Sequence, residues 1–318
     1  MSMSIEEMKD RLREDGYVII PNVLNDEECN EMNCKMFETL TYITKNRFQE
    51  NDTTTWREYY ELMPKNSMLI QNWSFGHAQY IWDIRQNPKV VNIFAQLWNV
   101  NNEDLLVSFD GTSIHLPPEI TGKGWREKAR SLNLHCDQAF NRNEFECYQG
   151  WITSNDIREY DGTLTVLKGS HRMHAQFADY ARRQKKLGKS DVDWYQLDDA
   201  QMEWFANQGL DQVYIECPKG SLVLWDSRTI HCGVQPSRKR TEANLRNIIY
   251  VCYTPRSLAT EANLRQKIQW FENLDMTSHW PHKGKKFPKT PRLYGPPPTL
   301  NTIPPPVLTE LGRRLVGY

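Results

Sequence analysis

Eight short apolar runs between residues 105 and 253, each broken by turn residues, constrain the fold of this chain most. Runs of about four to eight residues, repeated at short intervals, predict the strands of an all-β sandwich or barrel. Eight strands are what a jelly roll requires. The candidate strands are residues 105–109, 113–116, 131–136, 147–154, 163–167, 212–215, 221–224 and 247–253.

Helical patterns flank and interrupt these runs. Ser4 and Glu7 have the spacing of a capping box, which predicts a short helix that ends near residues 15–16. A strand is expected directly afterwards, over residues 17–20, and Pro21 stops it. The other expected helices begin at Asn25, at Asn87-Pro88 and after Ser170, or span residues 198–206 and 258–274. The fold class is therefore mainly β with flanking helices (α+β).

One domain is expected over residues 1–281. It has a helical part to about residue 103, a barrel core over about 104–255 and a helix over about 257–274. Residues 282–318 are basic and then proline-rich, so this tail is expected to be extended and either wrapped on the surface or loosely held.

Charge and cysteine content exclude several classes of protein. The chain has 39 basic and 40 acidic residues, so it lacks the global charge that binds nucleic acid or membranes. Seven scattered cysteines without a Cys-x-x-Cys motif favour reduced thiols. No apolar run approaches the roughly 20 residues of a spanning helix, and neither a signal peptide nor a peroxisomal C-terminal signal is recognisable. We expect an intracellular, cytoplasmic protein.

His135 and Asp137 are the first candidate functional residues. They lie two positions apart at the end of an apolar run, so in a strand both side chains point to the same face. His231 follows the run over residues 221–224 and would supply a third ligand if the two strands face each other. Two histidines and one carboxylate on one side of a metal are typical of non-haem Fe(II) oxygenases. Asp226 is an alternative carboxylate if its strand turns sharply.

Four motifs carry a resemblance to a known family. They are Gly-Tyr-Val-Ile-Ile-Pro at residues 16–21, His-Cys-Asp at 135–137, Gly-Thr-Leu-Thr-Val-Leu-Lys-Gly-Ser-His at 162–171 and Trp-Asp-Ser-Arg-Thr-Ile-His at 225–231. In this order, over about residues 10–255, they resemble the phytanoyl-CoA dioxygenase family.

The resemblance implies a cupin-like double-stranded β-helix and a metal site of His135, Asp137 and His231. It also implies Fe(II), 2-oxoglutarate as co-substrate and O2, with ascorbate as a further candidate. The implied reaction is hydroxylation of an organic substrate, coupled to decarboxylation of 2-oxoglutarate to succinate and CO2. Because Asp137 is a carboxylate, hydroxylation is favoured over halogenation, for which members of the family have a small residue there.

An arginine is expected to hold the distal carboxylate of 2-oxoglutarate, because a guanidinium binds a carboxylate through two parallel bonds. In families like this one it opens the strand after the second histidine, which points to Arg246. Arg238 and Arg240 are rivals, but their charge run is more typical of a solvated turn.

Other residues have two readings. Gln149, Trp151 and Thr153 alternate on one strand and either line the 2-oxoglutarate site or fill the barrel core. His171 is interpreted as structural or as support for the metal site rather than as a substrate contact, and Arg228 as positioning an anion or a loop carboxylate. His279 and His282 are interpreted as surface histidines.

The substrate is the least constrained part of the prediction. Basic clusters at residues 123–130, 182–189 and 238–240 would favour an anionic small molecule if they crowd the barrel mouth, although solvated loops are the preferred reading. Nucleic acid is disfavoured but left open, a membrane partner is not expected, and the oligomeric state is open. Two alternative functions remain, a non-catalytic barrel that binds or regulates, and a metallohydrolase with the same triad.

Overall fold

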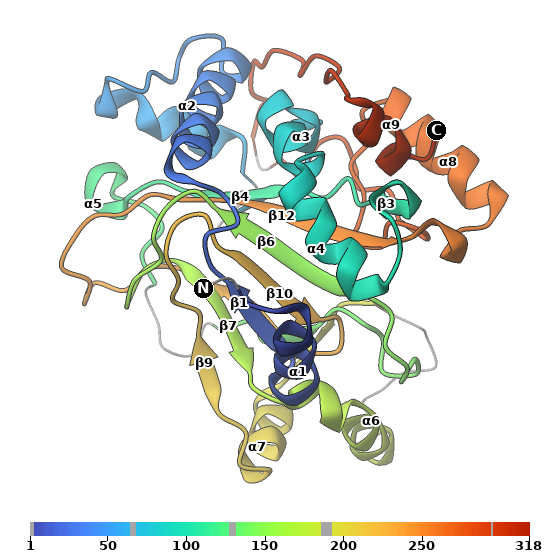
Figure 1. Cartoon of the computed structure of the whole chain (residues 1–318). Helices are drawn as coiled ribbons and strands as arrows, with labels where there is room; N and C mark the ends of the chain where they lie inside the picture. The colour runs from blue at the N-terminus through green and yellow to red at the C-terminus, as the bar shows by residue number, and fades with distance from the viewer. Residues whose placement is uncertain (1–2, 64–67, 127–131, 186–192, 294) are drawn as a thin grey trace.

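The computed structural model describes residues 3–63, 68–126, 132–185, 193–293 and 295–318, and Figure 1 shows antiparallel sheets flanked by helices. The mixed α+β class is therefore as predicted. The larger sheet has the order β1 (Tyr17–Ile20), β10 (Leu222–Asp226), β6 (Tyr148–Thr153), β12 (Arg246–Pro255), β4 (Thr112–His115) and β2 (Leu69–Ile70), with β3 (Leu105–Val107) also paired to β12. The smaller sheet has the order β8 (Tyr195–Gln196), β5 (His135–Cys136), β11 (His231–Val234), β7 (Thr163–Leu167) and β9 (Gln212–Tyr214).

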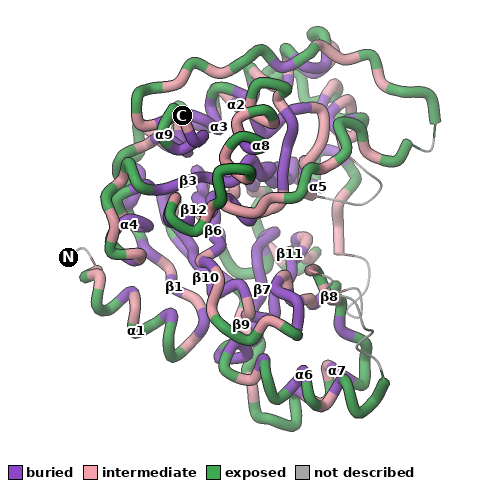
Figure 2. Tube along the Cα trace, turned by 90° about the vertical axis from the view of Figure 1, so that its right-hand side faces the viewer, coloured by how far each residue is buried: buried purple, intermediate pink, exposed green. Residues whose placement is uncertain are grey.

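Strand β12 shows how the larger sheet separates two cores. Side chains alternate along a strand, so odd and even positions face opposite sides. Ile249, Val251 and Tyr253 pack into the hydrophobic core formed with the helices. Ile248 and Tyr250 belong to a second core, between the two sheets, which also holds residues of β7 and β10. Buried residues accordingly run along the central strands in Figure 2.

Helices cover the outer side of each sheet. Above the larger sheet in Figure 1 lie α2 (Asp26–Ile43), α3 (Gln79–Arg85), α4 (Pro88–Trp98), α8 (Glu261–Glu272) and α9 (Glu310–Val316). The short α5 (Pro118–Thr121) lies at its edge, and α1 (Ile5–Asp15) packs against β1 and β10. Below the smaller sheet lie α6 (His174–Arg183) and α7 (Asp199–Asn207), whose Phe177 and Phe205 share a core with Cys136.

The expected helix starts are present. The Ser4 side chain accepts a hydrogen bond from the Glu7 backbone N–H at 3.2 Å, and Asn25 forms a reciprocal capping box with Glu28. Such caps satisfy backbone donors that have no partner in the first turn of a helix. Helix α8 begins after Thr260, slightly later than predicted, because Thr260 caps it.

Several elements were not predicted from the sequence. Helix α3 has buried residues at five of its seven positions, so it lacks the polar face that reveals a surface helix. Helix α9 lies in the tail, for which the sequence predicts an extended chain without a helix. It contains Gly312, which lowers its helix propensity. His231 follows strand β10, as predicted, but it also opens β11, a strand of four residues that includes Gly233 and that the sequence does not predict. The predicted strand over 131–136 begins outside the described residues and shortens to His135–Cys136.

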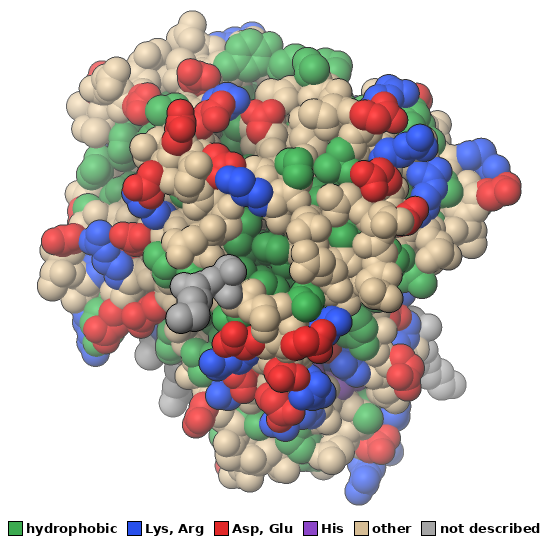
Figure 3. Space-filling view, viewed as in Figure 1, with side chains coloured by type: hydrophobic (Ala, Val, Ile, Leu, Met, Phe, Trp, Pro, Cys, Tyr) green, Lys and Arg blue, Asp and Glu red, His purple; other side chains and the backbone are tan. Residues whose placement is uncertain are grey.

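The surface around α1 carries no patch of a single charge, because acidic and basic side chains alternate there (Figure 3). Arg13, for example, contacts both Asp10 and Glu14. Within the described ranges, no helix combines the length and the apolar character that crossing a membrane requires.

Candidate metal centre

The smaller sheet brings His135 and His231 together. The two residues are direct partners across antiparallel strands β5 and β11, and their ring centroids lie 4.5 Å apart. Asp137 follows β5, with its carboxylate 3.6 Å from Nε2 of His135 and 3.4 Å from Nε2 of His231. One ligand atom from each residue lies within 4.8 Å of the others, which is the size of a metal site. The structure therefore assembles the three residues that the sequence pattern selected.

Backbone carbonyls fix the orientation of both imidazoles. Nδ1 of His135 lies 2.7 Å from the Asn133 carbonyl, and Nδ1 of His231 lies 2.9 Å from the Thr229 carbonyl. A ring nitrogen next to a carbonyl must carry the proton, so each Nδ1 donates and each Nε2 keeps its lone pair. Burial and the neighbouring His231 lower the pKa of His135 to about 4, so the ring is neutral at pH 7, as a ligand requires.

Asp137 is held by a strand of the facing sheet. Nε2 of Gln149, on β6, donates a hydrogen bond of 2.8 Å to Oδ2 of Asp137. Burial by itself raises the pKa of Asp137, but the imidazoles of His279, His231 and His135 lower that pKa well below its ordinary value. The carboxylate is therefore ionised and oriented toward the two histidines.

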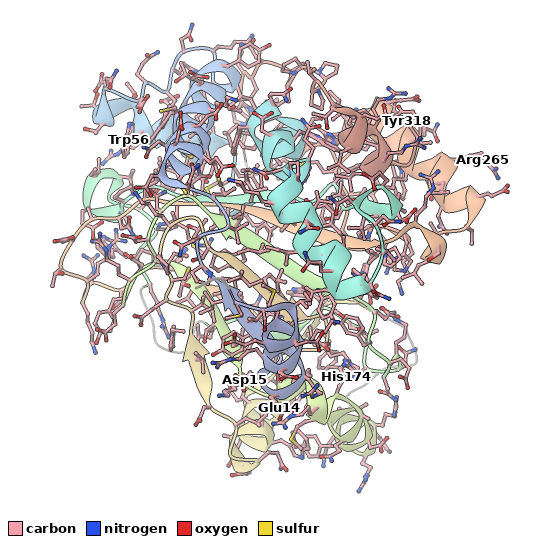
Figure 4. All side chains as sticks on the ribbon, viewed as in Figure 1. Glu14, Asp15, Trp56, His174, Arg265 and Tyr318 are labelled. Atoms are coloured by element: carbon pink, nitrogen blue, oxygen red, sulfur yellow. The ribbon has the colours of Figure 1, made fainter. Side chains whose placement is uncertain are left out.

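Residues of three sequence motifs are hydrogen-bonded together next to His231. This joint comprises Gly16 with Arg13, Ser170 with His171, and residues 226–230. The backbone N–H of Asp226 and the hydroxyl of Thr229 both donate to the carbonyl of Gly16, at 3.0 and 2.9 Å. The hydroxyl of Ser170 accepts from the N–H of Ile230 at 2.9 Å, and His171 bonds to the Arg13 carbonyl at 3.0 Å. Figure 4 labels Glu14 and Asp15 at this end of α1. The joint fixes the turn that delivers His231 to the site.

Arg246 is a buried cation without an acidic partner among the described residues. It is 4% exposed, its Nη1 bonds to the hydroxyl of Ser113, and Tyr250 is a second neutral neighbour. Its Nε has no hydrogen-bond partner, and it has no ion pair in the part of the chain that the structure describes. A buried guanidinium is costly unless an anion compensates it. The surroundings of Arg246 thus fit a bound carboxylate.

The rival arginines are engaged elsewhere. Arg240 pairs with Glu119 and with Asp161, the latter at 3.0 Å, and the guanidinium of Arg238 lies over the Trp125 ring at 4.9 Å.

The other strand candidates differ in their surroundings. Trp151 is fully buried in the core between the sheets, and its Nε1 has no partner among the described residues. The hydroxyl of Thr153 bonds to the Asn155 carbonyl at 2.7 Å. Of the three candidates on β6, the hydrogen-bond geometry therefore links only Gln149 to the triad.

His171 and Asp226 belong to the joint, and Arg228 lies beside Asp226. Both carboxylate oxygens of Asp226 accept from Arg228, at 2.9 and 2.7 Å, which is the loop carboxylate that the sequence suggested for this arginine. All three residues line a cavity of about 430 Å³ between α1 and α6, near His174 in Figure 4, whose described lining excludes the triad. Asp226 is therefore not the carboxylate of the metal-sized cluster.

The prediction that His279 is a surface histidine is wrong. Its Nδ1 lies 3.9 Å from Oδ2 of Asp137, and its side chain is 17% exposed. His282 is also partly buried, with Nδ1 3.1 Å from the Thr254 hydroxyl. A second residue beside the triad, Trp194, has its ring 5.7 Å from that of His135. Neither His279 nor Trp194 belongs to a motif, so no local signal identifies them.

Comparisons with known proteins find a chain of similar sequence and solved structures of similar fold. The chain is 29% identical over 282 residues to Ava biosynthesis cluster protein O of Aspergillus versicolor, and the match covers 86% of each chain. Among solved structures, it is similar to the GlcNAc Inducible Gene 2 protein of Candida albicans, with a TM-score of 0.55, 14% identity, and coverage of 83% of this chain and 66% of that one. AviO1 of Streptomyces viridochromogenes gives a TM-score of 0.50, 15% identity, and coverage of 80% and 96%.

A family model gives the assignment. The model of the phytanoyl-CoA dioxygenase family matches residues 12–238, which include His135, Asp137 and His231. Because this match spans well over half of the 318 residues, the chain belongs to the phytanoyl-CoA dioxygenase family of oxygenases.

Proposed function

We propose that the protein is an Fe(II)- and 2-oxoglutarate-dependent dioxygenase that hydroxylates a small organic substrate within a double-stranded β-helix. The observation that carries this proposal is the pairing of two features. A metal-sized triad of His135, Asp137 and His231 lies at the smaller sheet, and the buried Arg246 has no anionic partner among the described residues.

The triad fits Fe(II). Two neutral imidazoles and one carboxylate are the donor set of the facial arrangement that non-haem iron oxygenases use, with the remaining positions left for other ligands. Bound iron and 2-oxoglutarate would supply O2 activation coupled to decarboxylation of the 2-oxo acid to succinate and CO2. The chain's own contribution is to hold the three donors, with Gln149 orienting Asp137 and backbone carbonyls orienting both histidines.

The interior beside the triad fits 2-oxoglutarate. Arg246 opens β12, and Trp151 and Tyr250, which are register partners on β6 and β12, lie between it and Gln149. Buried polar atoms without a partner among the described residues line this face of the sheet: Nε of Arg246, Nε1 of Trp151 and Oε1 of Gln149. Buried polar groups normally have partners, so a polar ligand accounts for them together. Arg246 would bind the distal carboxylate.

Anaerobic spectroscopy tests this proposal. Wild-type protein with Fe(II) and 2-oxoglutarate should show the visible metal-to-ligand charge-transfer absorption, and His135→Ala should lose it. Absence of the band in the wild type, or its persistence in His135→Ala, would contradict the assignment. A zinc-dependent hydrolase with the same triad would retain activity without 2-oxoglutarate, and a non-catalytic barrel would give no band.

Hydroxylation itself needs a product measurement. In a metabolite mixture with Fe(II), 2-oxoglutarate and O2, one compound should gain the mass of one oxygen atom while succinate accumulates. A reaction that consumes 2-oxoglutarate but gives a product without added oxygen, such as an epimer or a ring-closed product, would contradict hydroxylation. It would leave the cofactor assignment intact.

A further inference from the structure

A segment after α8 reaches the triad from outside the region that the family model matches. Residues 275–289 lie after the matched residues 12–238 in the sequence, and α8 lies between the two. The N–H of Thr277 donates to the Phe109 carbonyl at 2.9 Å, and Thr277 and Lys286 form an antiparallel bridge that folds the segment back on itself. Its turn carries both His279 and His282.

His279 is the residue of this segment that faces the triad. Nδ1 lies 3.9 Å from Oδ2 of Asp137, which is beyond a direct hydrogen bond. Its Nε2 is buried and has no partner among the described residues. His282, three positions later, is satisfied by the Thr254 hydroxyl at 3.1 Å. An imidazole that is unsatisfied beside a metal ligand has hydrogen-bonding capacity left for a ligand.

Trp194 lies beside both His135 and Asp137. Its ring centroid is 5.7 Å from that of His135, and its backbone N–H donates to the Asp137 carbonyl at 3.2 Å. The residue is nevertheless 49% exposed, and its φ is +64°, in the left-handed region that large side chains rarely adopt. A large exposed aromatic ring in a strained backbone conformation, next to a metal ligand, indicates a binding role rather than packing.

An ion-pair network joins the segment that carries His279 to the loop that carries Trp194. Lys285, on the folded segment, lies 3.0 Å from Asp193, the neighbour of Trp194. Asp193 also pairs with Arg142, whose Nε lies 2.8 Å from Glu146. Lys283 reaches the same Glu146 at 2.9 Å. The network holds the segment of His279 and the loop of Trp194 in a fixed relation.

The same network bears on the charge of the substrate. Lys283 and Lys285 are neutralised by Glu146 and Asp193, and Arg240 by Glu119 and Asp161. Each of these cations therefore already has an acidic partner within the protein. The basic clusters at 123–130 and 182–189 lie partly outside the described residues.

We propose that Trp194 and His279 form the substrate-recognition site, and that they select an uncharged organic molecule with a flat apolar ring and an oxygen substituent. Trp194 provides a face on which the ring stacks, and His279 hydrogen-bonds the oxygen, beside the iron ligands His135 and Asp137. This inference rests on the proposed dioxygenase function, because it takes the triad as the reaction centre.

The test uses 1-naphthol as a probe of this class, with the full chain loaded with Co(II) and 2-oxoglutarate. Paramagnetic relaxation of the probe's protons reports their distance from the metal, and a titration gives the dissociation constant. In the wild type, naphthol protons should relax strongly. Trp194→Ala and His279→Ala should each weaken binding by about tenfold, and His279→Gln should recover part of the loss. The matched control His282→Ala, from the same segment, should bind like the wild type.

Three outcomes would overturn the inference. They are no metal-proximal naphthol in the wild type, equal affinity in His279→Ala and His282→Ala, or tighter metal-proximal binding of octanoyl-CoA that is insensitive to Trp194→Ala. The charge-transfer band of each Fe(II)-loaded variant separates this inference from the proposed function. A wild-type band without naphthol binding rejects only the substrate class, whereas no wild-type band rejects the dioxygenase itself.

Discussion

Gln149 donates a hydrogen bond of 2.8 Å to Asp137 across the space between the two sheets. A carboxylate held in this way keeps its orientation before metal arrives. Removing such a supporting contact typically lowers metal affinity about 10- to 100-fold. We therefore expect Gln149→Leu to weaken Fe(II) binding by this factor, measured by anaerobic titration of the charge-transfer band.

Thr153→Val is the matched control for Gln149→Leu. Thr153 lies on the same strand and the same face, but its hydroxyl bonds to the Asn155 carbonyl. Its Fe(II) affinity should equal that of the wild type. Equal affinities in all three proteins would show that Gln149 does not position Asp137.

Arg246→Gln should raise the 2-oxoglutarate concentration needed for half-saturation (the 2-oxoglutarate requirement) about 10- to 100-fold. This is the range expected when a charge-assisted hydrogen bond is lost. Fe(II) binding without 2-oxoglutarate should be unchanged. Arg240→Gln, which breaks contacts with Glu119 and Asp161, should leave the requirement at the wild-type value. If the Arg240 variant shows the increase instead, the anchor has been misassigned.

The sequence predicts those parts of the fold that local patterns determine. Strands β6 and β12 follow from short apolar runs bounded by turn residues, and α1 and α2 from their capping residues Ser4 and Asn25. The spacing of His135 and Asp137 places both side chains on one face, and β11 brings His231 opposite them.

The parts that the sequence does not predict depend on contacts between distant residues. His279 reaches Asp137 because residues 275–289 fold back through the Thr277–Phe109 bond and the Lys285–Asp193 pair. No local periodicity encodes either contact. The register of β11 on β5 is likewise set by its neighbours, since four residues that include Gly233 carry little strand propensity.

Gly16→Ala should destabilise the protein by about 2–4 kcal/mol, as seen in the free energy of unfolding in urea. Its φ of +80° costs a side chain about 1–2 kcal/mol, and a Cβ there would overlap His171 and lie 2.7 Å from the Thr229 hydroxyl. Gly209→Ala separates the two effects, because Gly209 has φ +73° with nothing within 4 Å of its added Cβ. A loss in Gly16→Ala no larger than in Gly209→Ala would show that the joint tolerates a methyl group.

Buried His77 should make the metal-free protein less stable in mild acid. Its Nδ1 accepts from Trp82 at 3.3 Å and its Nε2 donates to the Asp275 carbonyl at 3.0 Å, so a second proton would break a bond. Burial lowers the pKa of His77 from 6.5 to about 3. The unfolded chain therefore takes up the proton first, and stability present above pH 6.5 is lost as the pH falls toward 3.

Urea unfolding at pH 7.5, 6 and 5 measures the size of this effect. Below pH 6, the slope of the free energy of unfolding against pH should be smaller in His77→Gln by about 1.4 kcal/mol per pH unit, which is the contribution of one proton. Arg265→Ala, on the exposed face of α8 (Figure 4), should keep the wild-type dependence, because Arg265 is charged throughout this range. Identical slopes in the wild type and His77→Gln would mean that His77 is protonated within the folded protein, against the hydrogen-bond geometry with Trp82.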